Sequence, residues 1–154
     1  MDIGIINKLN KTSKSNSQLR FDKEDWYKNL KKSKLTPPDY VFGIVWSFLY
    51  ILMFIAFLLV VLEMKKPDYD KNLINLSVVF FLIQLFFNLS WTTLFFSLKK
   101  PKLALFDIAL TIIFTGITIY YFYQVNYIAA YLLIPYFLWI SFASYLNLYI
   151  VIKN

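Results

Sequence analysis

The stretch TPPDYVFGIVWSFLY, residues 36–50, marks the point where a polar, basic leader gives way to an apolar chain. Pro37 and Pro38 cannot lie inside a helix, because proline lacks the backbone N–H and its ring clashes with the preceding turn. A helix is therefore expected to begin at or just after Pro38. Asp39 then falls in the first turn, where the helix dipole favours an acidic side chain.

Composition predicts that this helix belongs to a membrane protein. Of the 154 residues, 59% are hydrophobic, 21% are aromatic and only 16% are charged. A soluble domain of this length could not bury that much apolar surface. Neither Tyr40–Leu62 nor Leu73–Leu98 contains a charge, and each run exceeds the roughly 20 residues that cross a bilayer core. The expected fold class is all-α, as a polytopic transmembrane helical bundle.

The charges and prolines divide the chain into two parts. A polar, basic segment is expected over residues 1–35, disordered or loosely interfacial over 1–20 and amphipathic over 21–35. The bundle is expected over residues 36–154, with a kink at Pro135. Short connections predict that consecutive helices pack as antiparallel neighbours. Four spans are expected, at about 39–63, 72–98, 103–123 and 127–152.

The distribution of Lys and Arg predicts the orientation. Nine of these residues lie in the leader, three in the Lys99–Lys102 turn and one at the C-terminus, all on one side of the expected bundle. The loop from Glu63 to Lys71 on the other side carries three. The positive-inside rule therefore places both termini in the cytoplasm, with a bacterial cytoplasmic membrane as the expected location. The net charge of +7 is then explained by the loops rather than by a nucleic-acid site.

Several kinds of chemistry are excluded by residues that the chain lacks. With no cysteine and no histidine, it cannot form a disulfide, a zinc site built on those residues, or haem ligation through either of them. Ser-His and Cys-His catalysis are excluded as well. Three glycines are too few for a phosphate-binding loop. No metal and no resident cofactor is expected.

Asp107 is the only acid well inside an expected span. A carboxylate within a membrane is costly, which favours a functional role. Asp107 also lies about one turn from Lys102, so an interfacial acid paired with a lysine or a helix end is the alternative. The sequence leaves both interpretations open.

Aromatic and amide side chains recur on single helix faces. Trp46 and Tyr50 are four residues apart, and the sets 88/91/95 and 139/143/147 are spaced by three or four residues, so each set shares a helix face. Helix packing explains such faces as well as ligand contact does. If the faces point inward, they form an aromatic box that suits a large planar apolar ligand. Its expected members are Trp46, Tyr50, Trp91, Phe95, Tyr136 and Trp139, with Asn88 and Asn147 as hydrogen-bonding groups.

Three segments, in order, resemble the translocator protein family, also called the TspO or tryptophan-rich sensory protein family. WYKNLKKSKLTPPDYVFGIVWSFLY (residues 26–50) is similar to that family's W-Y loop and its P-P-x-x-x-F-x-x-V-W-x-x-L-Y helix. FFNLSWTTLFFSLKKPKLALFDI (86–108) resembles its N-x-x-W…A-L-x-D helix pair, and YLLIPYFLWISFASYLNLYI (131–150) its last helix. Together they cover most of residues 26–154.

The resemblance implies five helices, of which the four expected spans correspond to the second to fifth. The first should end just before Trp26, yet nothing from Met1 to Asp25 is apolar enough to span a bilayer. Either this member has four helices, or the true start of the chain lies upstream of Met1.

The resemblance also implies a ligand and site residues. Family members bind porphyrins and isoquinoline-type drugs inside the bundle, beneath a lid that would contain Tyr27 and Pro37. Some bacterial members degrade protoporphyrin in light, through tryptophans that match Trp46 and Trp139. These two are therefore the tentative catalytic pair, and porphyrin is the expected ligand. Pocket positions carried over by motif are Trp46, Tyr50, Asn88, Trp139 and Ala143.

Two classes of function follow from these expectations. One is a membrane tetrapyrrole-binding sensor or receptor, with or without light-dependent breakdown of the porphyrin. The other is a transport or interaction protein without catalysis, in which the aromatic faces only pack helices. The lipid bilayer and a planar apolar ligand are the expected partners, a homodimer is left open, and nucleic acid is not expected. The set Leu146, Tyr149 and Lys153 also fits a short proposed sterol motif.

Overall fold

The structure is a computed structural model that describes residues 3–8, 10 and 26–154. Its described part contains four helices long and apolar enough to cross a membrane, and no strand. The all-α, four-span prediction is confirmed, and each span ends within two residues of its expected limit. The elements are α2 (Asp39–Leu62), the 3₁₀ turn η1 (Glu63–Lys65), α3 (Lys71–Thr92), the π-helical turn η2 (Thr93–Ser97), α4 (Pro101–Val125) and α5 (Tyr127–Lys153).

The chain divides into two units, with the main boundary between Lys31 and Lys32. In the first unit, residues 3–8 and 10 are helical; the expectation that this segment is disordered or loosely interfacial stays a prediction. Ile3 and Ile6 are exposed and three residues apart, so they share one face of this helical segment. The rest of the expected leader, residues 1–2, 9 and 11–25, lies outside the described residues.

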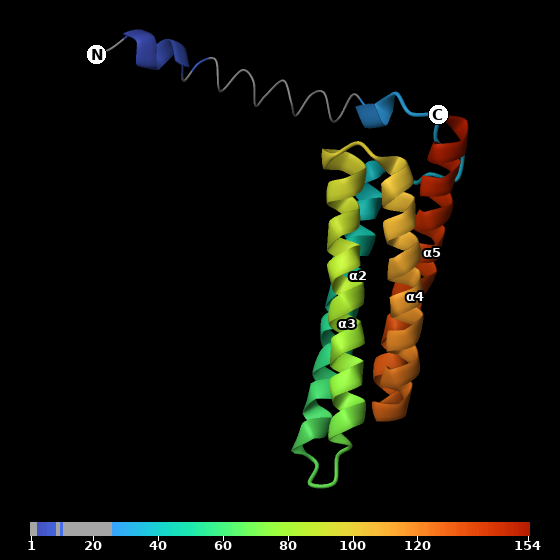
Figure 1. Cartoon of the computed structure of the whole chain (residues 1–154). Helices are drawn as coiled ribbons and strands as arrows, with labels where there is room; N and C mark the ends of the chain where they lie inside the picture. The colour runs from blue at the N-terminus through green and yellow to red at the C-terminus, as the bar shows by residue number, and fades with distance from the viewer. Residues whose placement is uncertain (1–2, 9, 11–25) are drawn as a thin grey trace. The chain divides into compact units, whose positions relative to one another are not determined.

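The second unit, residues 32–153, holds the four long helices. Figure 1 shows that the turn between α3 and α4 lies at the same end as the start of α2 and the end of α5. Consecutive helices therefore run antiparallel. Helix α4 packs along both α3 and α5, while α2 packs mainly against α5 and touches α3 only slightly.

Helices α2 and α3 are neighbours, as expected, since Phe57 stacks on Phe81 at 5.1 Å and the Tyr50 hydroxyl donates to Asn88. The backbone of α2 nevertheless lies closer to α5 than to α3. The physical reason is the narrow buried stripe of α2, formed by Leu49, Met53, Ala56 and Val60. A stripe spaced by three and four residues covers one side of a helix and can bury fully against one neighbour. In this structure the main neighbour is α5, although Met53 Sδ also lies 3.9 Å from Gln84 Nε2 on α3.

Threonines explain why α4 sits between two partners. The hydroxyls of Thr111, Thr115 and Thr118 donate to their own helix, to carbonyl oxygens four residues earlier, at 3.0, 2.6 and 2.7 Å. All three residues are buried. Because the hydroxyls are already satisfied, these small side chains let neighbouring helices approach closely without an unpaired polar group.

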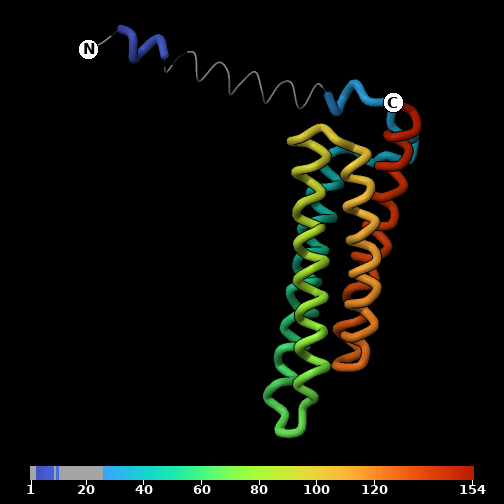
Figure 2. Tube along the Cα trace, in the orientation of Figure 1, coloured from blue at the N-terminus to red at the C-terminus, as the bar shows by residue number. Residues whose placement is uncertain are grey.

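A local irregularity ends α3. The turn η2 is a π-helix, in which the Leu98 N–H donates to the Thr93 carbonyl at 3.0 Å. Lys99 follows in a left-handed conformation with φ of 53°, and Pro101 then opens α4. Proline suits this first helical position because its missing N–H would have no partner there. The tube in Figure 2 shows the chain reversing tightly at this point.

Substituting Ala56 by Leu tests the packing of α2 on α5. Ala56 is fully buried, so extra methylene groups should force neighbouring side chains from their rotamers, at a cost of about 1–3 kcal/mol. The expected result is a lower midpoint of thermal unfolding in detergent. Ala109→Leu is the matched control, because Ala109 is exposed on α4. An equal effect at both positions would contradict this packing.

Candidate ligand site between α2 and α5

Aromatic rings from α2 and α5 form one continuous cluster. Trp46 stacks on Tyr50, with ring centroids 5.6 Å apart and an interplanar angle of 28°. The same indole meets Trp139 edge-on at 6.4 Å and Tyr136 at 6.3 Å. Phe42 adds a further edge contact with Trp139 at 5.6 Å. Four of the expected box residues are thus brought together, and they fill the space between these two helices.

Amides of α3 fix the phenols of this cluster. The Tyr50 hydroxyl donates to Asn88 Oδ1 at 2.6 Å, and the Tyr136 hydroxyl donates to Gln84 Oε1 at 2.8 Å. The hydroxyl of Thr115 also points to Gln84 Oε1, at 3.4 Å. Tyr136 and Gln84 are buried, and a buried hydroxyl without a partner costs about 1–3 kcal/mol. Asn88 and Gln84 therefore hold the aromatic rings in place.

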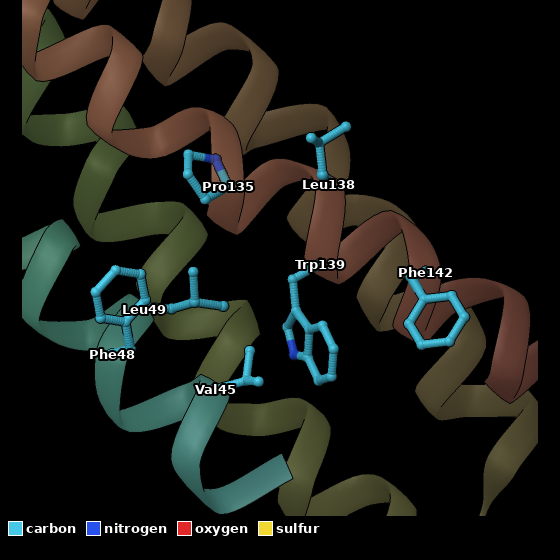
Figure 3. A pocket seen from close by; sticks show the side chains of 7 residues that line it. All are labelled: Val45, Phe48, Leu49, Pro135, Leu138, Trp139 and Phe142. Carbon is cyan, nitrogen blue, oxygen red and sulfur yellow. The ribbon is translucent and has the colours of Figure 1, made fainter. Parts of the chain in front are cut away.

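A groove of about 360 Å³ lies beside the ring cluster. Figure 3 shows its lining from α2 and α5, in which the Trp139 indole lies opposite Val45 and Leu49. Its size is at the lower end of the range of about 300–1,000 Å³ that is usual for ligand pockets. No charged side chain lines it. The lining residues are Val45, Phe48, Leu49, Pro135, Leu138, Trp139 and Phe142.

One polar atom in this apolar wall has no partner among the described residues. Trp139 Nε1 is buried and makes no hydrogen bond. An indole N–H can only donate, so a group that satisfied it would have to bring an acceptor. Trp139 therefore offers an apolar ring together with a single unused donor.

Three expected box residues lie in a separate cluster. Trp91 stacks on Phe95 at 5.2 Å, and its Nε1 donates to Asn147 Oδ1 at 3.0 Å. Asn147 Nδ2 in turn donates to the carbonyl oxygen of Pro101 at 2.9 Å. These bonds link α3, α5 and the start of α4. Both ends of the Asn147 side chain are occupied, so this cluster joins helices rather than offering free groups to a ligand.

The segment before α2 is anchored to α5. Ser33 Oγ and Tyr145 Oη are 3.2 Å apart, and the Leu35 N–H donates to Ser33 Oγ at 3.2 Å. Pro37 follows this anchored segment directly. Tyr27 belongs to the other unit of the chain, so its expected place in a lid stays a prediction.

The remaining expected residues lie on α5. Ala143 is buried, one turn beyond Trp139. Leu146 is also buried, and the Lys153 ammonium lies 6.0 Å from the centre of the Tyr149 ring. Nothing in these contacts tests sterol binding, so the motif stays a prediction.

The structure decides between the two interpretations of Asp107 as far as its pairing is concerned. Asp107 is buried on α4 and lies 2.7 Å from Ser90 Oγ on α3. Among the described residues it forms no ion pair, and Lys102 is exposed. The pairing with Lys102, which the sequence offered as one alternative, is not formed, because the five residues from Lys102 to Asp107 place the two side chains on different sides of the helix.

Sequence reasoning missed most of the groove. It named Pro135 and Trp139 for other reasons, but not the apolar residues around them. The signal was present in the spacing of positions 45, 48 and 49 and of positions 135, 138, 139 and 142, which follow helical periodicity. It could not be used without knowing that α2 packs on α5.

Comparison with known proteins places this arrangement in a family. The sequence profile described as the TspO/MBR family matches residues 3–152. The chain belongs to the TspO/MBR family. The expected resemblance is thereby confirmed, and with four apolar helices of spanning length the chain is an integral membrane protein.

Individual TspO relatives cover most of the chain. The Tryptophan-rich protein TspO of Chlorobaculum tepidum is 41% identical over 129 residues, which are 84% of this chain and 79% of the relative. The Tryptophan-rich sensory protein of Cereibacter sphaeroides is 34% identical, over 80% of this chain and 73% of its own length. The human Translocator protein is also 34% identical, over 79% and 70%.

The variant Asn147→Ala tests whether Asn147 joins helices. Its loss leaves Trp91 Nε1 and the Pro101 carbonyl without their partners, which should cost about 1–3 kcal/mol for each group that stays buried. We expect a clearly lower thermal midpoint of the ligand-free protein in detergent. Asn75→Ala, at an exposed position of α3, should change it little. If Asn147→Ala unfolds at the wild-type temperature, Asn147 does not hold the helices together.

Proposed function

We propose that this TspO/MBR chain is a membrane receptor for a porphyrin or a similar planar apolar ring, bound at the interface of α2 and α5. The observation that carries the proposal is the contact between Trp46 and Trp139, at 6.4 Å, beside an apolar groove. Stacking on such rings is worth about 0.5–1.5 kcal/mol beyond the burial of apolar area. With no histidine or cysteine in the chain, the ligand would be held by stacking rather than by their axial ligation.

Charge supports a definite orientation of such a ligand. Six lysines of residues 32–153 lie at the end where α2 and α4 begin and α5 ends, with Asp39 as the only acid there. The opposite end carries three lysines and three acids, from Glu63 to Lys71. Trp46 lies about 10 Å along α2 from Asp39. Acidic side groups of a porphyrin would therefore be directed toward the lysine-rich end.

Access to the site requires a local movement. The rings of Trp46, Tyr50 and Tyr136 are already in contact, so a macrocycle cannot lie between them as they stand. It would either seat in the groove against Trp139 or part α2 from α3. Parting these helices would break the 2.6 Å hydrogen bond between Tyr50 and Asn88 and the stacking of Phe57 on Phe81.

Light-driven chemistry is a further part of the proposal. Indole is readily oxidised and stacks well on a flat macrocycle. We propose that a bound, illuminated porphyrin is broken down in contact with Trp46 and Trp139, with dissolved molecular oxygen as the oxidant. The alternative function is transport or protein interaction without catalysis. It is favoured by the mutual packing of the rings, which contact one another without a ligand.

Replacing Trp46 or Trp139 by Phe separates these functions. Phe keeps most of the stacking and removes the oxidisable ring, so the dissociation constant for metal-free protoporphyrin should change by less than about tenfold, or 1.4 kcal/mol. Light-driven loss of porphyrin absorbance should slow severalfold. Trp91→Phe is the control, since Trp91 lies in the other aromatic cluster. If porphyrin absorbance is lost at the wild-type rate in both variants, the two tryptophans only pack the helices and take no part in the breakdown.

The lysine asymmetry also predicts orientation in the membrane. We propose a bacterial cytoplasmic membrane with the lysine-rich end in the cytoplasm, following the positive-inside rule. Single cysteines replacing Lys34 and Asp68, both exposed, report on the two ends. An impermeant thiol reagent added to intact cells should label Asp68→Cys and spare Lys34→Cys. Labelling of Lys34→Cys and not of Asp68→Cys would show that the lysine-rich end faces the outside of the cell.

A further inference from the structure

Asp107 is a buried carboxyl that the proposed ligand site does not use. Only 5% of its surface is exposed. Its Oδ1 lies 2.7 Å from Ser90 Oγ, and that oxygen lies 3.0 Å from the carbonyl oxygen of Phe87. Asp107 Oδ2 is buried and has no hydrogen-bond partner.

Counting hydrogens distinguishes the two forms of this carboxyl. Ser90 has one hydroxyl hydrogen but two oxygen neighbours, so it cannot donate fully to both. If Asp107 is ionised, Ser90 must donate to it, and the negative charge shared by Oδ2 stays buried without a partner. If Asp107 is neutral, its own O–H donates to Ser90 Oγ, and Ser90 donates to the Phe87 carbonyl. The second arrangement makes both short contacts hydrogen bonds and leaves only a neutral carbonyl oxygen unpaired.

No counter-charge in the described residues favours the ionised form. From Asn72 to Leu98, α3 and η2 have no titratable side chain, and the only cation in α4 is the exposed Lys102. Lys99 and Lys100, in the turn that joins η2 to α4, are exposed as well. At the same end of α5, the Tyr145 hydroxyl is next to Ser33, and Tyr149 lies beneath Lys153. Further along the bundle, Tyr50 and Tyr136 donate to amides of α3. A buried carboxylate without a cation costs several kcal/mol, and the neutral acid avoids this cost.

We propose that Asp107 and Ser90 form a proton-binding site at the contact of α3 and α4, in which the neutral carboxylic acid is the donor and Ser90 relays the bond to Phe87. The bound proton is what allows the two helices to meet at this point. Its loss would place an unpaired negative charge between them, three residues before the π-helical turn that ends α3. Such turns often mark functional positions in helices.

Infrared spectroscopy of the full chain in detergent tests the site directly. At pH 7–8 the wild-type protein should show the C=O stretch of a protonated carboxylic acid, shifted by exchange into D2O and absent from Asp107→Asn. Ser90→Ala should move this band to higher frequency, because the acid loses its acceptor. Asp68→Asn, at an exposed loop position, should leave the band unchanged. Absence of the band from the wild type, or its persistence in Asp107→Asn, would overturn the proposal.

The pH dependence of stability gives a second readout with a definite sign. The folded state holds one proton that the unfolded state releases above the ordinary aspartate range, near pH 4. Stability should therefore fall as the pH rises, by up to about tenfold per pH unit in the unfolding equilibrium, until the folded state loses the proton as well. Asp107→Asn, which mimics the neutral acid, should lose this component and match or exceed the wild type at pH 8. A flat difference between the two across pH 5–8 would count against the site.

Failure of Asp107→Asn to fold would not leave the question open. The infrared band of the wild type and its shift in Ser90→Ala do not depend on that variant. If Ser90→Ala keeps the wild-type band at its original frequency at pH 8, the acid that carries the band does not contact Ser90, and the assignment to Asp107 is wrong.

Discussion

Lipid offers no hydrogen-bond partners, and this constraint shapes the interior of the bundle. The backbone meets it by forming continuous helices, and the side chains meet it by pairing between helices. Gln84 serves Tyr136, Asn88 serves Tyr50, and Asn147 serves both Trp91 and the start of α4. Each amide links two or more helices. These hydrogen bonds therefore fix how far each helix is shifted along its neighbour, which apolar contacts alone would not fix.

The same constraint separates the aromatic residues by role. In one cluster, the Trp91 N–H donates to Asn147, so this side chain joins helices. In the other, Trp139 keeps a buried N–H with no partner, beside a groove that opens between α2 and α5. An unpaired donor is costly where no water reaches it. The tryptophan with an unused hydrogen-bond donor is thus the one that lines the groove.

The sequence predicted those features that depend on one helix at a time. Uncharged runs gave the spans, Pro37 and Pro38 the start of α2, and four-residue spacing the aromatic faces. It could not say how each face is turned relative to its neighbours. For that reason Trp91 and Asn147 were expected beside Trp46 but lie in another cluster, and the partner of Asp107 is Ser90 rather than Lys102. The preference of α2 for α5 over α3 also arises from the fit of whole surfaces, which no local pattern encodes.

Pro135 has a mechanical consequence for the groove that it lines. Proline cannot donate to the carbonyl of Tyr131, one turn earlier, so α5 lacks one of the bonds that normally stiffen a helix. The two halves of α5 can therefore change their mutual angle without breaking a further backbone bond. Since α5 contacts both α4 and α2, such a bend would change how α5 lies against these helices beside the groove. A change in that angle would move both ends of α5 relative to the residues that line the groove.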